Sequence, residues 1–237
     1  MCPFGAMASG LLPCGVGITV YVGSNGAPDQ AMSEKTSKHL RDRTEQLLDE
    51  RGQTYAHEAG IELKDKPSPL YQLLVLTTLL SARITAGIAV AAARELRGAG
   101  WRTPKAMAEA SWGQIVEALG RAHYKRYDES TATALGKSAD LLNDRWRGDL
   151  RRLRGEAGGD PDRIRELLQE FAGIGPVGAE IFCREAQGIW PELRPSFDRR
   201  ALDGAGKYDL PKDPEKLAEL VAPKDLPRLA AALVRAA

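Results

Sequence analysis

The segment LYQLLVLTTLL, from Leu70 to Leu80, is apolar on nearly every side of the helix that it would form. A helix of this kind must be covered on all sides, either by other helices or by lipid. A membrane span needs a run of about 18 apolar residues, and the chain contains no such run. We therefore expect no membrane-spanning segment. The pattern predicts that this helix lies at the centre of a helical bundle, which a chain of 237 residues is long enough to build.

Helical patterning continues along almost the whole chain after Ser33. Residues 37–51 place Leu40, Leu47 and Leu48 on one face and charged side chains elsewhere. Short Gly, Pro or Asp breaks divide the remainder into further predicted helices at 85–98, 104–110, 111–119, 127–146, 161–171, 176–187 and 214–221, with one more near the C-terminus. No alternation typical of a strand occurs beyond residue 32, so the predicted fold class is all-α.

The first 31 residues differ from the rest of the chain. They are rich in Gly, Pro and small apolar residues, and they carry no charge before Asp29. A secretory signal peptide would begin with a positively charged segment, which is missing here. We interpret residues 1–31 as a poorly ordered extension, for which a misassigned translation start is one explanation. Within it, residues 16–22 could form a short strand.

The charge balance and the cysteines exclude several classes of protein. The chain has 33 Lys and Arg residues against 32 Asp and Glu residues, which excludes a protein that holds DNA by bulk positive charge alone. It allows a protein whose basic residues share one face. Cys2, Cys14 and Cys183 are too few for a disulfide framework and lack the spacing of a metal site, which favours a reducing cytoplasmic compartment and no bound metal. Cys183 lies in an apolar run and is expected to be a small buried side chain.

Residues 161–186 have the pattern of two helices joined by a short glycine hairpin. Asp160 can cap the first helix, with Pro161 at its first position, where the missing N–H costs nothing. The chain then turns through AGIG (172–175) and re-enters a helix at Pro176. The N–H groups at the start of the second helix would form an anion site, strengthened by the helix dipole.

Two glycines flank one apolar residue in this hairpin. Gly173 and Gly175 allow the backbone to approach another molecule closely, while Ile174 would hold the hairpin in the core. The pattern indicates a helix–hairpin–helix of the kind that grips a DNA phosphate. A tight structural corner between two helices is the alternative.

An aspartate lies downstream, in the segment RPSFDRRAL (194–202). A Pro and a Ser lead into Asp198 and a short helix follows, so we expect Asp198 at or near a helix start, where a plain N-cap is one role for it. Arg184, Arg199 and Arg200 are candidates for phosphate contacts. The densest basic run, RWRGDLRRLR (145–154), interleaves Trp with Arg as nucleic-acid-binding segments do, but a solvated loop explains it equally well.

Three blocks of this sequence together resemble the endonuclease III branch of the helix–hairpin–helix (HhH-GPD) DNA glycosylases. They are SPLYQLLVLTTLLSARIT (68–85), LQEFAGIGPVGA (168–179) and FD (197–198), in the family's order and near its spacing. Between them, TPKAMAEA (103–110) is similar to a further helix of the family. The resemblance covers about residues 66–205.

The resemblance implies a bilobal helical protein. Residues 67–186 would form a six-helix barrel that carries the helix–hairpin–helix, and residues 33–66 and 187–237 would form a second lobe. Double-stranded DNA would lie across the groove between the lobes, with a damaged or mismatched base flipped out toward a carboxylate. The expected protein is a monomer associated with the nucleoid.

The resemblance also implies roles for individual residues. Asp198 matches the family's catalytic aspartate, and Gly173, Gly175 and Val177 fall in the DNA-binding hairpin. Arg83 stands where the family often has a glutamine that enters the gap left by the flipped base; a basic residue exposed at the rim is the alternative.

Two departures from the family's pattern bear on mechanism. Many members hold an iron–sulfur cluster with four cysteines after the aspartate, whereas no cysteine follows Cys183 here, so we expect no cluster and no other cofactor. Bifunctional members place a lysine just after the hairpin, whereas this chain has Val177 there and no lysine between Lys137 and Lys207. Without that nucleophile, the expected enzyme is monofunctional: it removes a base and leaves the strand intact.

The expected chemistry then needs only water and a carboxylate. Breaking an N-glycosidic bond builds positive charge on the sugar, as in glycoside hydrolysis. We expect Asp198 mainly to stabilise that charge and secondarily to act as a general base toward water. Two alternatives stay open: a catalytically silent DNA-binding protein, and a glycosylase/lyase that uses a lysine from elsewhere, such as Lys125 or Lys207. The sequence does not specify which base is excised.

Overall fold

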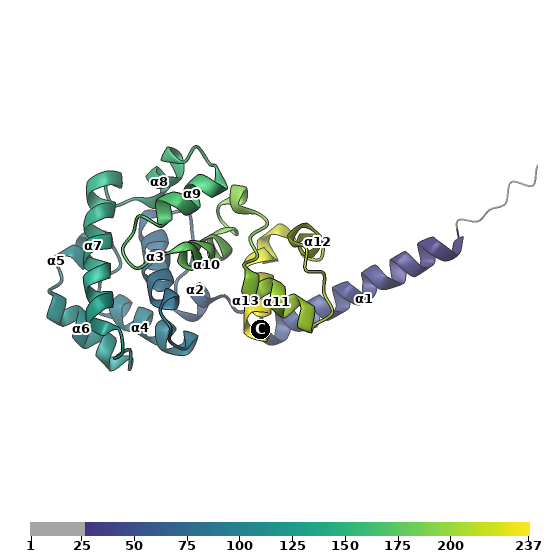
Figure 1. The fold of residues 1–237 in the computed structure, drawn as a ribbon, viewed down its shortest axis with the longest axis horizontal. Helices are drawn as coiled ribbons and strands as arrows, with labels where there is room; N and C mark the ends of the chain where they lie inside the picture. Colours follow the sequence, from purple (N-terminus) through teal and green to yellow (C-terminus); the bar gives the residue numbers. More distant parts are fainter. Residues whose placement is uncertain (1–26) are drawn as a thin grey trace, which may run out of the picture. The chain divides into compact units, whose positions relative to one another are not determined.

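The structure, a computed structural model, describes residues 27–237 and the side chains of residues 38–237. Its helices are α1 (Ala27–Arg51), α2 (Tyr55–Glu58), α3 (Pro67–Ser81), α4 (Ala86–Gly98), α5 (Pro104–Glu109), α6 (Trp112–Arg121), α7 (Asp128–Trp146), α8 (Leu150–Glu156), α9 (Pro161–Leu168), α10 (Pro176–Ala186), η1 (Pro191–Leu193), α11 (Arg199–Lys207), α12 (Pro214–Ala218), η2 (Pro223–Asp225) and α13 (Leu226–Ala236). No strand occurs between residues 27 and 237, so the all-α prediction is confirmed (Figure 1).

Residues 38–237 form one compact unit. The predicted extension over residues 1–31, with its strand at 16–22, lies outside the described residues except for its last few, where α1 begins at Ala27. No described helix is long and apolar enough to cross a membrane.

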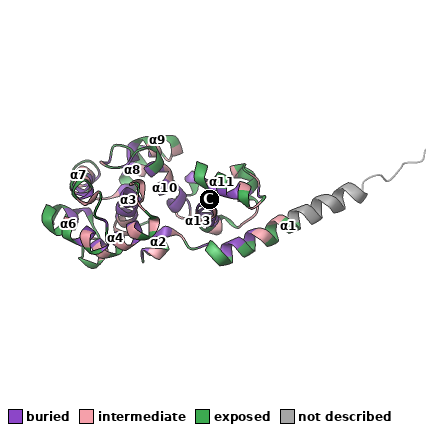
Figure 2. Cartoon of the chain, turned by 60° about the horizontal axis from the view of Figure 1, so that its bottom comes forward, coloured by how far each residue is buried: buried purple, intermediate pink, exposed green. Residues whose placement is uncertain are grey.

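Helix α3 is the centre of the packing within residues 38–237. It contacts α4, α7, α8 and α10, and its side chains from Leu70 to Leu79 are buried except for Gln72. Figure 2 shows this burial along the helix. Burial on all sides is what an all-round apolar helix requires, so the predicted position of this segment at the centre of a bundle is confirmed.

The helix ends follow local capping signals. The Asp160 carboxylate accepts a hydrogen bond from the Asp162 N–H at 2.9 Å, with Pro161 as the first residue of α9. Ser111 and Gln114 form a reciprocal capping box at the start of α6. Because such signals are local, the helices predicted at 85–98, 104–110, 111–119, 127–146, 161–171, 176–187 and 214–221 all end within three residues of the observed bounds.

The basic run 145–154 is mostly helical, with a turn at residues 147–149. It contains the start of α8, capped by Asp149, whose Leu150 and Leu153 are buried. Trp146 is 2% exposed and its ring lies 5.5 Å from that of Phe171. Three of the five arginines of the run are held by acidic partners: Arg145 by Glu156 and Glu170, Arg151 by Asp149, and Arg154 by Asp65 and Glu192. The interpretation as a solvated loop was therefore wrong, because residues 145–146 end α7 and residues 150–154 belong to α8. Nucleic-acid binding by this run stays a prediction.

The C-terminal helices pack on one another and on the hairpin region. Helices α11 and α13 make the most extensive contact between two helices, and α13 also contacts α10. The approach of α11 to α13 depends on Gly204, because a Cβ there would lie 2.0 Å from the Leu233 carbonyl oxygen. Arg43 of α1 forms an ion pair with Asp209 at 3.2 Å, which joins α1 to the segment after α11. The proposed division into two lobes stays a prediction.

Candidate active site

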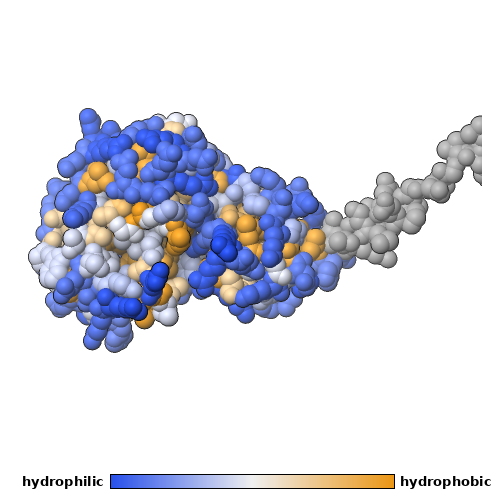
Figure 3. Space-filling model, viewed as in Figure 1, coloured by the Kyte–Doolittle hydropathy of each residue, from blue (hydrophilic) through white to orange (hydrophobic). Residues whose placement is uncertain are grey.

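A pocket of about 510 Å³ lies among helices α3, α9, α10, α11 and α13. Its apolar wall is made by Tyr55, Leu80, Ile84, Ala86, Pro176, Val177, Ile181 and Val234. Its polar side is made by Arg165, Gln169, Glu180, Arg184, Asp198, Arg199, Arg200 and Asp203. Figure 3 shows hydrophobic and hydrophilic residues meeting along a hollow in the face of the molecule that it displays. An apolar cavity with convergent polar groups is the usual form of a small-ligand site.

The hairpin between α9 and α10 borders this pocket, and its two glycines differ. Gly173 has a φ of +83°, in the left-handed region, and a Cβ there would lie 3.1 Å from Thr78 Cγ2. Gly175 has a φ of −98°, and a Cβ there would meet nothing within 4 Å. Ile174 is 4% exposed and holds the turn in the core, as predicted. The fold thus requires glycine at position 173 only, while the space at Gly175 is open to another molecule.

Close packing of α10 on α3 sets the position of Val177. A Cβ at Gly178 would lie 2.6 Å from Ser81 Oγ, so the two helices approach more closely than a larger residue would allow. Val177, next to this contact, is 69% exposed and lines the pocket. An exposed apolar side chain therefore occupies the position where the family resemblance would place a lysine.

Asp198 is the N-cap of α11, as predicted, and both of its carboxylate oxygens have partners. Oδ1 accepts a hydrogen bond from the Ala201 N–H at 2.8 Å. Oδ2 forms an ion pair with Nη1 of Arg184. The side chain is 13% exposed and lines the pocket. The carboxylate is therefore held in one orientation at the wall of the cavity.

The residues just before Asp198 are fixed by the end of α10. Gln187 is fully buried; its Nε2 donates to the Ser196 carbonyl at 2.9 Å, and its Oε1 accepts from the Ser196 N–H at 3.0 Å. The Gln187 side-chain amide thus pairs with both backbone groups of Ser196, as one β-strand residue pairs with another. The position of Asp198 is thus set from α10 as well as from α11.

Arg184 is the buried cation of the site, which corrects its sequence-based interpretation as a phosphate contact. Its side chain is 3% exposed, and its guanidinium lies 5.7 Å from the centroid of the Tyr55 ring. Glu185 is also buried and lies 4.0 Å from the Arg184 Nε. The Glu185 Oε2 accepts from the Ala56 N–H at 2.9 Å, and burial raises the pKa of this carboxyl above its ordinary value.

Sequence reasoning missed the link between Arg184 and Asp198 but had a signal for it. Two adjacent charged residues interrupt the apolar run of α10, and both are buried in the structure. Neighbouring residues on a helix point about 100° apart, so two such side chains can both be buried only where the helix is covered on two sides. A buried charge also requires a partner, which the sequence alone could not identify.

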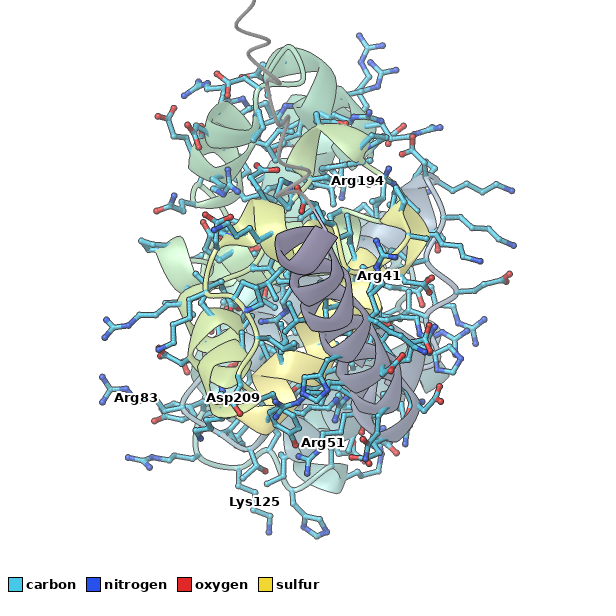
Figure 4. The ribbon with its side chains drawn as sticks, turned by 90° about the vertical axis from the view of Figure 1, so that its right-hand side faces the viewer. Arg41, Arg51, Arg83, Lys125, Arg194 and Asp209 are labelled. Carbon is cyan, nitrogen blue, oxygen red and sulfur yellow. The ribbon has the colours of Figure 1, made fainter. Side chains whose placement is uncertain are left out.

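The remaining predicted residues are only partly brought together. Arg199, 97% exposed in its side chain, and Arg200, also exposed, line the pocket next to Asp198. Arg83 is exposed in the turn between α3 and α4 and does not line the pocket, although Leu80 and Ile84 on either side of it do. Figure 4 shows Arg83 extending away from the body of the molecule.

No lysine of the described residues lines the pocket. Lys207 donates to the carbonyl oxygen of Ala237, and Lys125 extends outward in the turn after α6 (Figure 4). Within the same residues, no group of three or more His, Cys, Asp or Glu side chains could hold a metal ion. Cys183 is fully buried, as expected, and burial raises its pKa to about 12. The predicted absence of a cofactor stays a prediction.

Comparison with known proteins gives distant structural similarity alone. No family model matches the chain, and no curated protein matches it. Among solved structures, the chain is similar to a trapped endonuclease III–DNA covalent intermediate in an estranged-adenine complex. The sequence identity is 15%, the alignment covers 82% of this chain and 84% of that chain, and the TM-score is 0.45. A similarity this distant assigns no role to any residue of this chain.

Proposed function

We propose that this protein is a monofunctional DNA glycosylase, which flips a damaged or mismatched base out of the duplex and hydrolyses its N-glycosidic bond. The observation that carries the proposal is the carboxylate of Asp198, held at the wall of a pocket of about 510 Å³ beside a glycine hairpin. A cavity of this size is in the range that encloses small ligands, and it would admit a flipped base. The sequence resemblance to HhH-GPD glycosylases supports the same assignment.

The pocket supplies the groups that this reaction needs. Bond breaking leaves positive charge on the sugar, and an ionised carboxylate at a helix N-terminus stabilises such charge. The two lone-pair directions of Asp198 that are not used by Ala201 and Arg184 are available to the sugar or to a water molecule. Apolar side chains such as Ile181 and Val177 exclude bulk water around the base.

The proposal of base removal without strand cleavage rests on Val177. A lyase reaction needs an amine that attacks the sugar carbon. Val177, the position just after the hairpin where bifunctional members of the family have a lysine, carries an isopropyl group instead. Incubation of the protein with an abasic duplex and borohydride should give no covalent adduct above background. A strong trapped band would contradict this part of the proposal, and peptide mapping would then identify the lysine, with Lys125 and Lys207 as the first candidates.

A panel of duplexes, each with one damaged or mismatched base, tests the proposal under single-turnover conditions, with and without alkali. The wild-type protein should release one class of base and show strand breaks only after alkali. Asp198→Asn should lower that rate by about 10²–10³-fold, because it removes the charge that faces the developing cation. Its affinity for DNA should be retained, since a carboxylate that repels phosphates is lost.

Asp213→Asn is the matched control. Asp213 is the N-cap of α12 and accepts from the Lys216 N–H at 3.0 Å, but it does not line the pocket. It should excise at the wild-type rate. Because Asp198→Asn also leaves Arg184 without its counter-ion, both variants should be assayed at a temperature where circular dichroism shows them folded. DNA binding without release of any base from the panel would favour a catalytically silent DNA-binding protein.

A further inference from the structure

The buried Arg184 makes more specific contacts than a structural arginine needs. Its Nη1 pairs with Asp198 Oδ2, its guanidinium faces the Tyr55 ring, and its Nε lies 4.0 Å from Glu185 Oε1. Its Nε has no hydrogen-bond partner, and neither does Glu185 Oε1. A cation this deeply buried is costly unless its partners are fixed. The guanidinium is therefore committed to one orientation, in which it points at Asp198.

The other end of this arrangement is anchored to the backbone. Glu185 is fully buried and accepts from the Ala56 N–H at the start of α2. It lies beside Arg184 on α10, and Arg184 in turn reaches α11 through Asp198. A chain of contacts thus runs from the backbone of α2 through the side chains of Glu185 and Arg184 to the carboxylate of the candidate active site.

The contacts of Asp198 show what Arg184 adds. The Ala201 N–H holds Oδ1 alone, which would leave the carboxylate free to rotate about its Cβ–Cγ bond. The ion pair at Oδ2 removes that freedom, because both oxygens then have fixed donors. A catalytic group held in this way loses little entropy on reaching the transition state.

We infer that Arg184 is a positioning residue that fixes the carboxylate of Asp198 toward the pocket, with Glu185 as the support that orients Arg184. The inference rests on the proposed glycosylase function, since it concerns the rate of that reaction. Arg184 lines the pocket with only 3% of its side chain exposed, so its proposed effect on the rate is exerted through Asp198.

The chain offers a close control for this inference. Arg235 packs on the same Tyr55 ring, at 4.3 Å from its centroid, and is also partly buried. Its ion pair is with Glu58 at 2.6 Å instead of with Asp198. Substitution of either arginine disturbs the packing around Tyr55, but only substitution of Arg184 releases the candidate catalytic carboxylate.

Single-turnover excision of the base that the wild type releases should be measured for Arg184→Met, Arg184→Lys and Arg235→Met, with duplex affinity and melting temperature for each. Arg184→Met should lower the rate by about 10²-fold, as a misplaced catalytic group does. Arg184→Lys should lower the excision rate by about tenfold, because a single ammonium group cannot reproduce the fixed, planar set of donors of a guanidinium. Arg235→Met should excise within about threefold of the wild-type rate. Duplex affinity should be retained in all three.

The decisive measurement is the double variant. In the Asp198→Asn background, Arg184→Met should lower the excision rate no further, because Arg184 acts only through the carboxylate. Added guanidinium ion should partly restore the rate of Arg184→Met and not that of Arg235→Met.

Three results would overturn the inference: a wild-type rate in Arg184→Met or Arg184→Lys, an equal loss in Arg235→Met, or a full further loss in the double variant. If Arg184→Met does not fold, Arg184→Lys decides with the same criteria. Absence of excision by the wild type across the whole panel would instead overturn the proposed function, and the inference with it.

Discussion

At the scale of single residues, the fold buries the Glu185 carboxyl in an environment that disfavours its ionised form. It is fully buried, one of its oxygens has no donor, and burial raises its pKa above the ordinary value of about 4.5. A raised pKa means that the folded state binds a proton more tightly than the unfolded state does. Protonated Glu185 therefore favours the folded state. This contribution to the free energy of unfolding is fully present below about pH 4.5 and is lost as the pH rises through the folded-state pKa.

Glu185→Gln should remove this pH-dependent loss. The amide can still accept from the Ala56 N–H, and it carries no charge at any pH. The free energy of unfolding, measured by denaturant titration from pH 4.5 upward, should therefore change in favour of the variant relative to wild type as the pH rises. Glu215→Gln, an exposed position in the first turn of α12, should run parallel to wild type. A variant that becomes relatively less stable with rising pH would show that ionised Glu185 is a net stabilising partner of Arg184.

The sequence was informative about residues whose role is local. Asp198 was predicted at a helix start because a capping carboxylate needs only the next three residues, and the structure shows the bond to Ala201. Its ion pair with Arg184 joins residues that are 14 positions apart and depends on how α10 and α11 pack. No local rule contains that information, which is why Arg184 was mistaken for a surface side chain.

At the scale of elements, the hairpin separates a conformational requirement from a binding requirement. Gly173→Ala should destabilise the fold by about 1–2 kcal/mol, because φ is +83° and the new Cβ would press on Thr78. Gly175→Ala should leave stability nearly unchanged, because φ is −98° and the space is open. Denaturant titration of both variants measures the difference.

Gly175→Asp then tests whether the hairpin binds DNA. It should weaken duplex binding by about ten- to a hundredfold relative to Gly175→Ala at the same salt concentration, because a carboxylate would stand where a phosphate is expected. Fluorescence anisotropy with a short duplex measures the affinity. Equal affinities for the two variants would mean that the hairpin is only a structural corner.

Helices were predicted well where hydrophobic periodicity and capping residues agreed. Helix α8 was missed because its many charged residues leave little hydrophobic periodicity. Helix α8 follows a turn in which the backbone of Arg147 is in the left-handed region and the next residue is glycine. Most of the residues of α8 are charged or Gly. Its apolar face consists only of Leu150 and Leu153. A face of two residues gives almost no periodic signal, so tertiary contacts to α7 and α9 decide its structure.

At the scale of the whole molecule, the near balance of 33 basic and 32 acidic residues conceals an uneven use of charge. Arg145, Arg151 and Arg154 of the 145–154 run are held by acidic partners, and the buried Arg184 is paired with Asp198. Arg199 and Arg200 are exposed at the pocket. Net charge therefore says little about where a polyanion would bind, and the placement of each ion pair says more.

This distribution predicts which arginines release counterions when DNA binds. Arg199→Ala and Arg200→Ala should each reduce the slope of log affinity against log salt concentration by about 0.9, because each removes one phosphate contact. Arg151→Ala is the control: its side chain is 44% exposed, but its guanidinium is held by Asp149 at 2.7 Å, so the slope should not change. Affinities measured between about 50 and 200 mM salt give the three slopes. A drop for Arg151→Ala with no drop for Arg199→Ala or Arg200→Ala would mean that DNA follows α8 instead, and that the pocket containing Asp198 lies away from the bound duplex.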